Sequence, residues 1–238
     1  MITAYYKNNL CELYHGDSLE IIPQLQGEID LCFTDPPFAF AGAISNGSTA
    51  LADAQFFTFW FKSVAKNIIK KIKMSGYMFV WCDWRTINIL NEAFTSGSAP
   101  YKTWAVSQII YHDRAMLGMG KPFRNQIEMI ALIKNSKSDF KDRIPKTTSN
   151  IFKHYSYYGK HEYHPAQKII PVAEQFVKWG SDPGDRVLDC FAGSATTAIA
   201  CQSNKRRWIG IEQNEEYCEI AAKRIEAAAS QLSFEDYL

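Results

Sequence analysis

The sequence lacks several patterns that would assign a protein to a common class at once. None of its apolar runs is long enough to cross a membrane, and the first 17 residues hold no apolar signal-peptide core. The six cysteines form no Cys-x-x-Cys pair, and several lie in apolar stretches, so we expect reduced core thiols rather than zinc ligands or disulfides. These absences predict a cytoplasmic protein without a metal site.

Two glycine-rich signatures of nucleotide binding are absent as well. The sequence contains neither Gly-x-Gly-x-x-Gly nor Gly-x-x-x-x-Gly-Lys. The first absence weighs against an NAD or FAD pyrophosphate cradle, and the second excludes a P-loop.

A strong overall charge is also missing, since the net charge of the 238 residues is +1. The charge is unevenly spread, however. Residues 112–168 hold 11 lysines and arginines against 5 acidic residues, and the rest of the chain holds 15 against 20. A local basic excess is typical of a phosphate-contacting surface, although a solvated lysine-rich loop would give the same count.

Alternating apolar strands and amphipathic helices predict the architecture. Apolar strands are expected at 28–34, 77–84, 101–112, 125–135, 185–193 and 206–213. Helical spacing is expected at 54–73, 85–97, 166–180, 194–205 and 214–232, a mobile loop at 39–54, and little periodicity at 135–164. This order predicts one α/β domain over 1–238, with a mostly parallel sheet covered by helices on both faces.

The strand at 28–34 ends in the stiff segment Asp35-Pro36-Pro37-Phe38. Each proline fixes its own φ, lacks an N–H and keeps the preceding residue out of the helical region. The segment is therefore extended and poor in donors, with the Asp35 carboxylate, the Pro36 carbonyl and the Phe38 ring close together. This arrangement predicts a pocket for a planar group that donates hydrogens, while an ordinary strand end with a tight turn is the alternative.

A second motif, "VLDCFAGSATT", reads as strand, glycine turn and helix. A doubly wound sheet binds nucleotide-like ligands at such turns. Asp189 lies beside the turn at Gly193, and the next strand ends in Glu212, where a carboxylate can accept from ribose hydroxyls. Ordinary helix–sheet packing explains this motif equally well when it is taken alone.

Together the two motifs resemble those of S-adenosylmethionine-dependent amino-methyltransferases, which methylate exocyclic amino groups of DNA bases. The resemblance covers nearly the whole chain and implies the Rossmann-like fold of those enzymes. It makes Asp35, Pro36, Pro37 and Phe38 the catalytic motif. Its cofactor segment Asp-x-Phe-x-Gly-Ser-Gly is matched by Asp189, Phe191, Gly193 and Ser194, with Ala195 in place of the last glycine.

Further segments extend the resemblance. "HPAQKII" is similar to the family's His-Pro-x-x-Lys-Pro, with Ile169 in place of proline, and implies that Lys168 lies near the methionine carboxylate of the cofactor. "LYHGDSLE" implies that Asp17 accepts from the cofactor's adenine amino group. The catalytic motif precedes the cofactor motif, as in the permuted group called beta. The basic insert at about 112–164 then corresponds to target recognition, with Arg114, Lys121 and Arg124 as candidate DNA contacts.

The resemblance implies methyl transfer to the amino group of adenine in double-stranded DNA after base flipping. Asp35 favours adenine, because the family's cytosine enzymes usually carry Ser-Pro-Pro. Transfer to cytosine, to an RNA base or to a protein amide stays open, and so does a non-catalytic DNA-binding relative. The sequence leaves open a homodimer, a cognate restriction nuclease and the target sequence.

Overall fold

The computed structural model of the protein describes residues 2–37, 49–95, 104–115, 117–118, 121–140, 142–154 and 168–235. Its side chains are described except at 49–55 and 232–235. Within these ranges the helices are α1 (Ser18–Ile21), the 3₁₀ turn η1 (Ile22–Gln24), α2 (Thr49–Lys71), α3 (Ile87–Thr95), α4 (Ile170–Gly180), α5 (Thr196–Ser203) and α6 (Glu215–Glu235).

Nine strands form one sheet in the described part of the chain. They are β1 (Tyr6–Lys7), β2 (Cys11–His15), β3 (Ile29–Thr34), β4 (Ile72–Cys82), β5 (Ala105–Asp113), β6 (Ile127–Lys134), β7 (Ile151–Lys153), β8 (Arg186–Asp189) and β9 (Arg207–Glu212). Their order across the sheet is β1-β2-β9-β8-β3-β4-β6-β5-β7. The central strands β2, β9, β8, β3 and β4 are mutually parallel, whereas β6 runs antiparallel to both β4 and β5.

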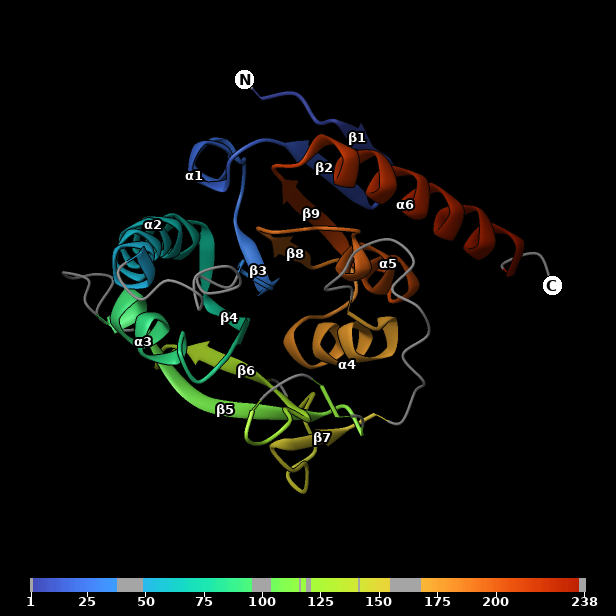
Figure 1. Cartoon of the computed structure of the whole chain (residues 1–238). Coiled ribbons are helices and arrows are strands. Elements are labelled where there is room, and N and C mark those ends of the chain that lie inside the picture. Colours follow the sequence, from blue (N-terminus) through green and yellow to red (C-terminus); the bar gives the residue numbers. More distant parts are fainter. Residues whose placement is uncertain are drawn as a thin grey trace.

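Helices cover both faces of this sheet, as expected from the sequence (Figure 1). Alternate residues of β3 point to opposite faces, because successive side chains of a strand alternate. Leu31 and Phe33 pack in the cluster that contains α4, α5 and α6, whereas Cys32 packs in the cluster that contains α1, α2 and α3. Each face thus has its own apolar core.

Three local expectations need correction. The helix expected to begin at residue 54 begins at Thr49, because the alanines and leucine of 50–54 favour a helix over a mobile loop. Its end is Lys71, and Gly76 lies inside β4, where a Cβ would come within 2.5 Å of the Asp30 carbonyl oxygen. The weakly periodic segment 135–164 contains the strand β7, whose three residues are too few for visible alternation.

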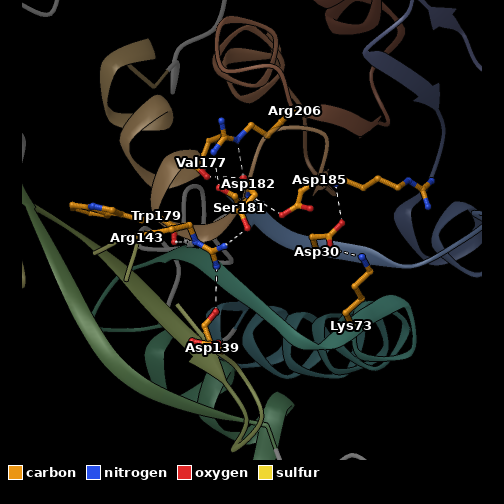
Figure 2. A network of polar contacts seen from close by, with 11 residues as sticks. Asp30, Lys73, Asp139, Arg143, Val177, Trp179, Ser181, Asp182, Asp185 and Arg206 are labelled. Atoms are coloured by element: carbon orange, nitrogen blue, oxygen red, sulfur yellow. Dashed lines mark hydrogen bonds and ion pairs between the residues drawn. The ribbon is translucent and has the colours of Figure 1, made fainter. Parts of the chain in front are cut away.

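Polar contacts close the edge of the sheet at which the parallel strands begin (Figure 2). The Asp30 carboxylate accepts from the Arg186 amide at 2.9 Å and pairs with the Lys73 ammonium at 2.5 Å, so it connects β3, β8 and β4. Nearby, the Arg143 guanidinium pairs with Asp182 at 2.9 Å. These contacts tie the amino ends of the strands together, and the carboxyl ends form the other edge.

Candidate active site

The two sequence motifs meet at the carboxyl ends of β3 and β8, which are neighbouring parallel strands. The chain leaves β3 toward α2 and β4 on one side and leaves β8 toward α5 and β9 on the other. Such a change of direction separates the loops that follow the two strands and opens a crevice between them. The fold therefore places Asp35 and Asp189 at the position where this class of sheet binds its ligands.

A cavity of about 740 Å³ opens at this position. Ten of the eleven catalytic and cofactor residues expected from the sequence line it, and the eleventh, Phe38, lies outside the described residues. The ten are Asp17, Asp35, Pro36, Pro37, Lys168, Asp189, Phe191, Gly193, Ser194 and Glu212. Residues from positions 17 to 212 thus form one pocket.

Asp35 is half-buried directly after β3, and its carboxylate faces the ammonium of Lys168. The distance from Lys168 Nζ to Asp35 Oδ2 is 3.1 Å, and Nζ lies 4.2 Å from the centre of the Trp81 ring. The acidic neighbours raise the pKa of Lys168 against the effect of burial, which alone would lower it. The structure pairs Lys168 with the catalytic motif, and its expected place beside the methionine carboxylate of a cofactor stays a prediction.

Glu128 is a second partner of Lys168 that the sequence analysis missed. Its Oε1 lies 3.4 Å from Lys168 Nζ, and its Oε2 lies 3.0 Å from Nδ1 of the buried His112. Burial raises the pKa of Glu128, but Lys168 and His112 outweigh it and hold the pKa at about 2. The available signal was a glutamate within the otherwise apolar run "IEMIALI".

Asp189 ends β8 and is buried, which raises the pKa of its carboxyl to about 6. Its Oδ1 accepts hydrogen bonds from the Thr34 hydroxyl at 2.9 Å and from the Phe191 amide at 3.2 Å. These bonds favour the ionised form and therefore limit the rise. Asp189 is an acid poised to ionise when a positive charge enters the cavity.

The turn after Asp189 is held by Glu212 at the end of β9. Gly193 donates its amide to Glu212 Oε2 at 2.8 Å, and Asn214 donates its amide to Oε1 at 2.8 Å. Gly193 has φ 49° and Ala195 has φ 61°, so both adopt the left-handed conformation. Ala195, which replaces the family's glycine, therefore keeps a glycine-like turn in spite of its Cβ.

Asp17 forms the opposite wall of the cavity as the N-cap of α1. Its Oδ1 accepts from the Leu19 amide at 2.8 Å, and the next residue, Ser18, donates its hydroxyl to the Cys190 carbonyl at 2.5 Å. The second contact fixes α1 against the end of β8. The position of Asp17 relative to Asp189 is thus set by a hydrogen bond between neighbouring elements.

The three candidate DNA contacts lie outside the cavity, on the connection between β5 and β6. Arg114 donates to the carbonyls of Asn125 and Gln126 at 2.6 and 3.3 Å. Arg124 donates to those of Gly118 and Leu117 at 2.8 and 3.2 Å. The two arginines thus hold the conformation of the connection.

Lys121 is exposed on the same connection, two residues from Phe123, whose side chain is 86% exposed. Cys82 at the end of β4 pairs with Met129 at the start of β6, so this connection rises from the edge of the sheet that carries the cavity. The β5–β6 connection, with Lys121 exposed on it, is therefore on the side of the molecule from which a large substrate could reach Asp35.

Comparison with protein families adds a relationship over most of the chain. The model of a family described as DNA methylase, N6_N4_Mtase, matches residues 29–223, which contain both motifs. "DNA adenine methyltransferase YhdJ" of Escherichia coli (strain K12) is 24% identical over 94% of this chain and 85% of its own. "Type II methyltransferase M2.DpnII" of Streptococcus pneumoniae is 26% identical over 95% of this chain and 94% of its own.

Solved structures share the fold. The M1.HpyAVI–SAM complex superposes with a TM-score of 0.69 at 24% identity, covering 91% of this chain and 100% of that one. The cytosine-N4-specific PvuII DNA methyltransferase superposes with a TM-score of 0.76 at 19% identity, covering 97% of this chain and 95% of that one. The expected Rossmann-like methyltransferase fold is confirmed by these neighbours.

Proposed function

The chain belongs to the N6/N4 family of DNA methylases, and from this premise we propose that it methylates the exocyclic amino group of adenine in double-stranded DNA. The resemblance drawn from the sequence is confirmed at the level of the family, so the protein is an S-adenosylmethionine-dependent DNA methyltransferase. The base, the residues that act on it and the DNA-contacting surface are the proposed part.

One observation carries the proposal: the catalytic and cofactor motifs line a single cavity. Asp35 and Pro36 form one wall after β3, and Asp189, Gly193 and Glu212 form another after β8 and β9. The motifs are far apart in sequence, so their meeting at neighbouring strand ends was not imposed by local structure. A pocket with both walls can hold a methyl donor and an acceptor together.

The residues of this pocket fit S-adenosylmethionine. A cavity of about 740 Å³ has room for the cofactor and part of a base. In our proposal Asp17 accepts from the cofactor's adenine amino group, and Glu212 accepts from its ribose hydroxyls. Asp189 supplies negative charge near the cofactor's cationic end, and Phe191, Gly193 and Ser194 form the floor. The bound cofactor supplies an electrophilic methyl group on its sulfonium.

The protein's part in the reaction is to orient and polarise the target amino group. The lone pair of an adenine amino nitrogen is delocalised into the ring, which makes it a poor nucleophile. The Asp35 carboxylate and the Pro36 carbonyl would accept hydrogen bonds from its two N–H groups, so the nitrogen would approach a tetrahedral geometry with its lone pair free to attack. The methylated nitrogen would then lose one of its protons. The negative charge of Asp35 also stabilises the positive charge that develops on the nitrogen.

The flipped base needs a face to stack on, and we assign this role to Phe38, the residue after Pro37. Stacking of a base on an aromatic ring contributes about 1–3 kcal/mol in other systems. Adenine is favoured over cytosine because Asp35 stands where the cytosine enzymes usually carry serine. The relatives include a DNA adenine methyltransferase, and the structural neighbours include a cytosine-N4-specific enzyme.

For DNA contact we propose the basic segment at about 112–164 within a single domain of residues 1–238. The connection between β5 and β6 belongs to this segment and carries Lys121 among exposed neighbours. A homodimer, a cognate restriction nuclease and a cytoplasmic location complete the proposal. Across the described part of the chain, every helix is either too short or too polar to span a membrane.

The direct test is methyl transfer by the purified protein from labelled S-adenosylmethionine to unmethylated genomic DNA, followed by nucleoside analysis. We expect label in N6-methyladenine. Label in N4-methylcytosine would replace adenine by cytosine, and label in neither nucleoside would refute the proposed activity. Cofactor affinity measured on the same preparation separates a non-catalytic relative from an inactive sample.

A further inference from the structure

A chain of polar contacts runs from Asp35 to the residues from which the β5–β6 connection starts. Asp35 Oδ2 lies 3.1 Å from Lys168 Nζ, and Lys168 Nζ lies 3.4 Å from Glu128 Oε1. Glu128 Oε2 in turn lies 3.0 Å from His112 Nδ1. Four side chains from four separate segments are thus linked without a gap.

The chain is shielded from water along its length. The exposed fraction is 21% for the Asp35 side chain, 18% for Lys168, 22% for Glu128 and 1% for His112. Charges at such depth interact more strongly than charges at the surface, because water screens them less. A change in the charge or position of one side chain should therefore alter the electrostatic environment of the next.

The last two residues of this series of contacts, Glu128 and His112, lie where the proposed DNA-contacting connection between β5 and β6 begins and ends. His112 and Glu128 are cross-strand partners in β5 and β6, and the connection of residues 114–126 starts directly beyond them. The two residues therefore stand at the base of the connection, and one of them, Glu128, also contacts Lys168. The contact chain joins the connection to the catalytic carboxylate.

We propose that Lys168 and Glu128 are positioning residues for Asp35, and that they couple the β5–β6 connection to the catalytic motif. The Lys168 ammonium fixes the plane of the Asp35 carboxylate and keeps it ionised, while Glu128, oriented by His112, fixes Lys168. A shift of the connection on DNA binding is passed through Glu128 to Asp35. This inference rests on the proposed methyl transfer. It gives Lys168 a role other than the one implied by its motif and adds Glu128, which lies outside the sequence motifs.

The alternative role of Lys168, contact with the methionine carboxylate of the cofactor, makes a different prediction. In that role, loss of Lys168 weakens cofactor binding and leaves the ionisation of Asp35 unchanged. In the positioning role, loss of the ammonium favours the neutral form of Asp35. A pH profile and a binding curve on the same variants distinguish the two.

The first pair of variants is Lys168→Met and Lys168→Arg, each measured for kcat against pH and for cofactor affinity. The titratable or charged groups around Lys168 and Asp35 are Glu128 on β6, His112 and Arg114 at the end of β5, Cys82 on β4 and Asp189 on β8. Without the ammonium, the acid limb of kcat should move to higher pH by about one unit or more. Lys168→Arg should restore the limb, because it returns the positive charge.

The second pair is Glu128→Gln and the matched control Glu92→Gln, which removes an ion-paired carboxylate from the exposed surface of α3. Glu128→Gln should lower kcat by about 10- to 100-fold, with DNA and cofactor affinities within about twofold of the wild type. Its acid limb should move to lower pH, because the Lys168 charge then acts on Asp35 alone. Glu92→Gln should match the wild type in every measurement.

Three results would overturn the inference. One is an unchanged acid limb in Lys168→Met combined with weaker cofactor binding, which assigns Lys168 to the cofactor. Another is a normal kcat in Glu128→Gln. The third is a uniform loss of activity in all Lys168 and Glu128 variants with unshifted limbs, which indicates a structural role. A wild-type protein that methylates neither base refutes the proposed function instead, because all the variant comparisons need wild-type activity.

Discussion

The hydroxyl of Thr34 donates a hydrogen bond of 2.9 Å to the carboxylate of Asp189, although 155 residues separate them. The same hydroxyl accepts from the Cys190 amide at 3.0 Å. Thr34 is the last residue of β3 and directly precedes Asp35. The buried Thr34 side chain thus fixes the end of β3, where the catalytic carboxylate follows, relative to the end of β8, where the cofactor residues lie.

Replacement of Thr34 by valine should weaken the attachment between the ends of β3 and β8. Thr34→Val keeps the shape but leaves the Cys190 amide without its acceptor and removes one of the hydrogen bonds that Asp189 Oδ1 accepts. The expected cost is about 1–3 kcal/mol in unfolding free energy. Denaturant unfolding measures this cost, and Thr34→Ser, which keeps the hydroxyl, is the control. Equal stability of Thr34→Val and the wild type would show that the bond does not hold the strand ends.

Cofactor affinity should depend on pH through Asp189. Burial raises the pKa of this carboxyl from 3.8 to about 6, so in the free protein it is neutral below pH 6 and ionised above. The cationic end of the cofactor favours the ionised form, and binding below pH 6 therefore requires loss of a proton. Affinity should fall as the pH drops through 6, by at most about tenfold per unit. Calorimetry between pH 5 and 8 measures it.

The control for this prediction is Asp189→Asn, which cannot ionise. Its cofactor affinity should be weaker than that of the wild type at pH 8 and flat between pH 5 and 8. A wild-type affinity that stays constant, or that improves as the pH falls, would place the cofactor's charge away from Asp189.

Ala195 is predicted to be a strained position. Its φ of 61° costs an L-residue about 1–2 kcal/mol, and replacement by glycine removes this strain from the folded state. Glycine also has more conformational freedom in the unfolded chain, which lowers the stability by about 0.5–1 kcal/mol. Ala195→Gly should therefore leave the unfolding free energy unchanged or raise it by up to about 1 kcal/mol. The same substitution at Ala227, exposed within α6, should lower it by about 1 kcal/mol. Equal losses at both positions would contradict the strain.

The β5–β6 connection should respond differently to the loss of Lys121 and of Arg124. Lys121→Ala removes an exposed charge and should reduce the slope of log affinity against log salt by about 1 if this lysine meets a phosphate. Arg124→Ala also releases two backbone carbonyls and should weaken DNA binding more than Lys121→Ala does. Lys70→Ala, at the far end of α2, is the control of equal charge. If the plots of log DNA affinity against log salt were identical for the three variants, the DNA interface would lie elsewhere.

The pocket could be predicted from the sequence because its residues belong to short motifs that fix local backbone geometry. The prolines after Asp35 stiffen the end of β3, and the turn at Gly193 follows from a small flexible residue after a buried strand. Parallel strands then bring both ends to one edge of the sheet. Local chemistry and the α/β pattern indicated six of the ten residues, namely Asp35, Pro36, Pro37, Asp189, Gly193 and Glu212. The other four, Asp17, Lys168, Phe191 and Ser194, were expected from the family resemblance.

The contacts of Lys168 could not be predicted in this way. Its partner Glu128 is 40 residues away on an antiparallel strand, and the register of β4 with β6 decides that they meet. The arginines at 114 and 124 were read as DNA contacts from their charge, while their bonds to nearby carbonyls depend on the fold of the connection. Charge counts locate a basic segment but do not show which of its side chains are already engaged.

The central claim is that the Asp35 carboxylate activates the target amino group, and Asp35→Asn tests it most directly. The amide keeps the shape of the side chain but removes the negative charge that stabilises the nitrogen as it becomes positive. Transfer of labelled methyl to DNA should fall by about 100-fold or more, with cofactor affinity on the same protein within about twofold of the wild type. Near-normal transfer by Asp35→Asn would contradict the account, whereas equal losses of transfer and cofactor binding would place Asp35 in the cofactor site.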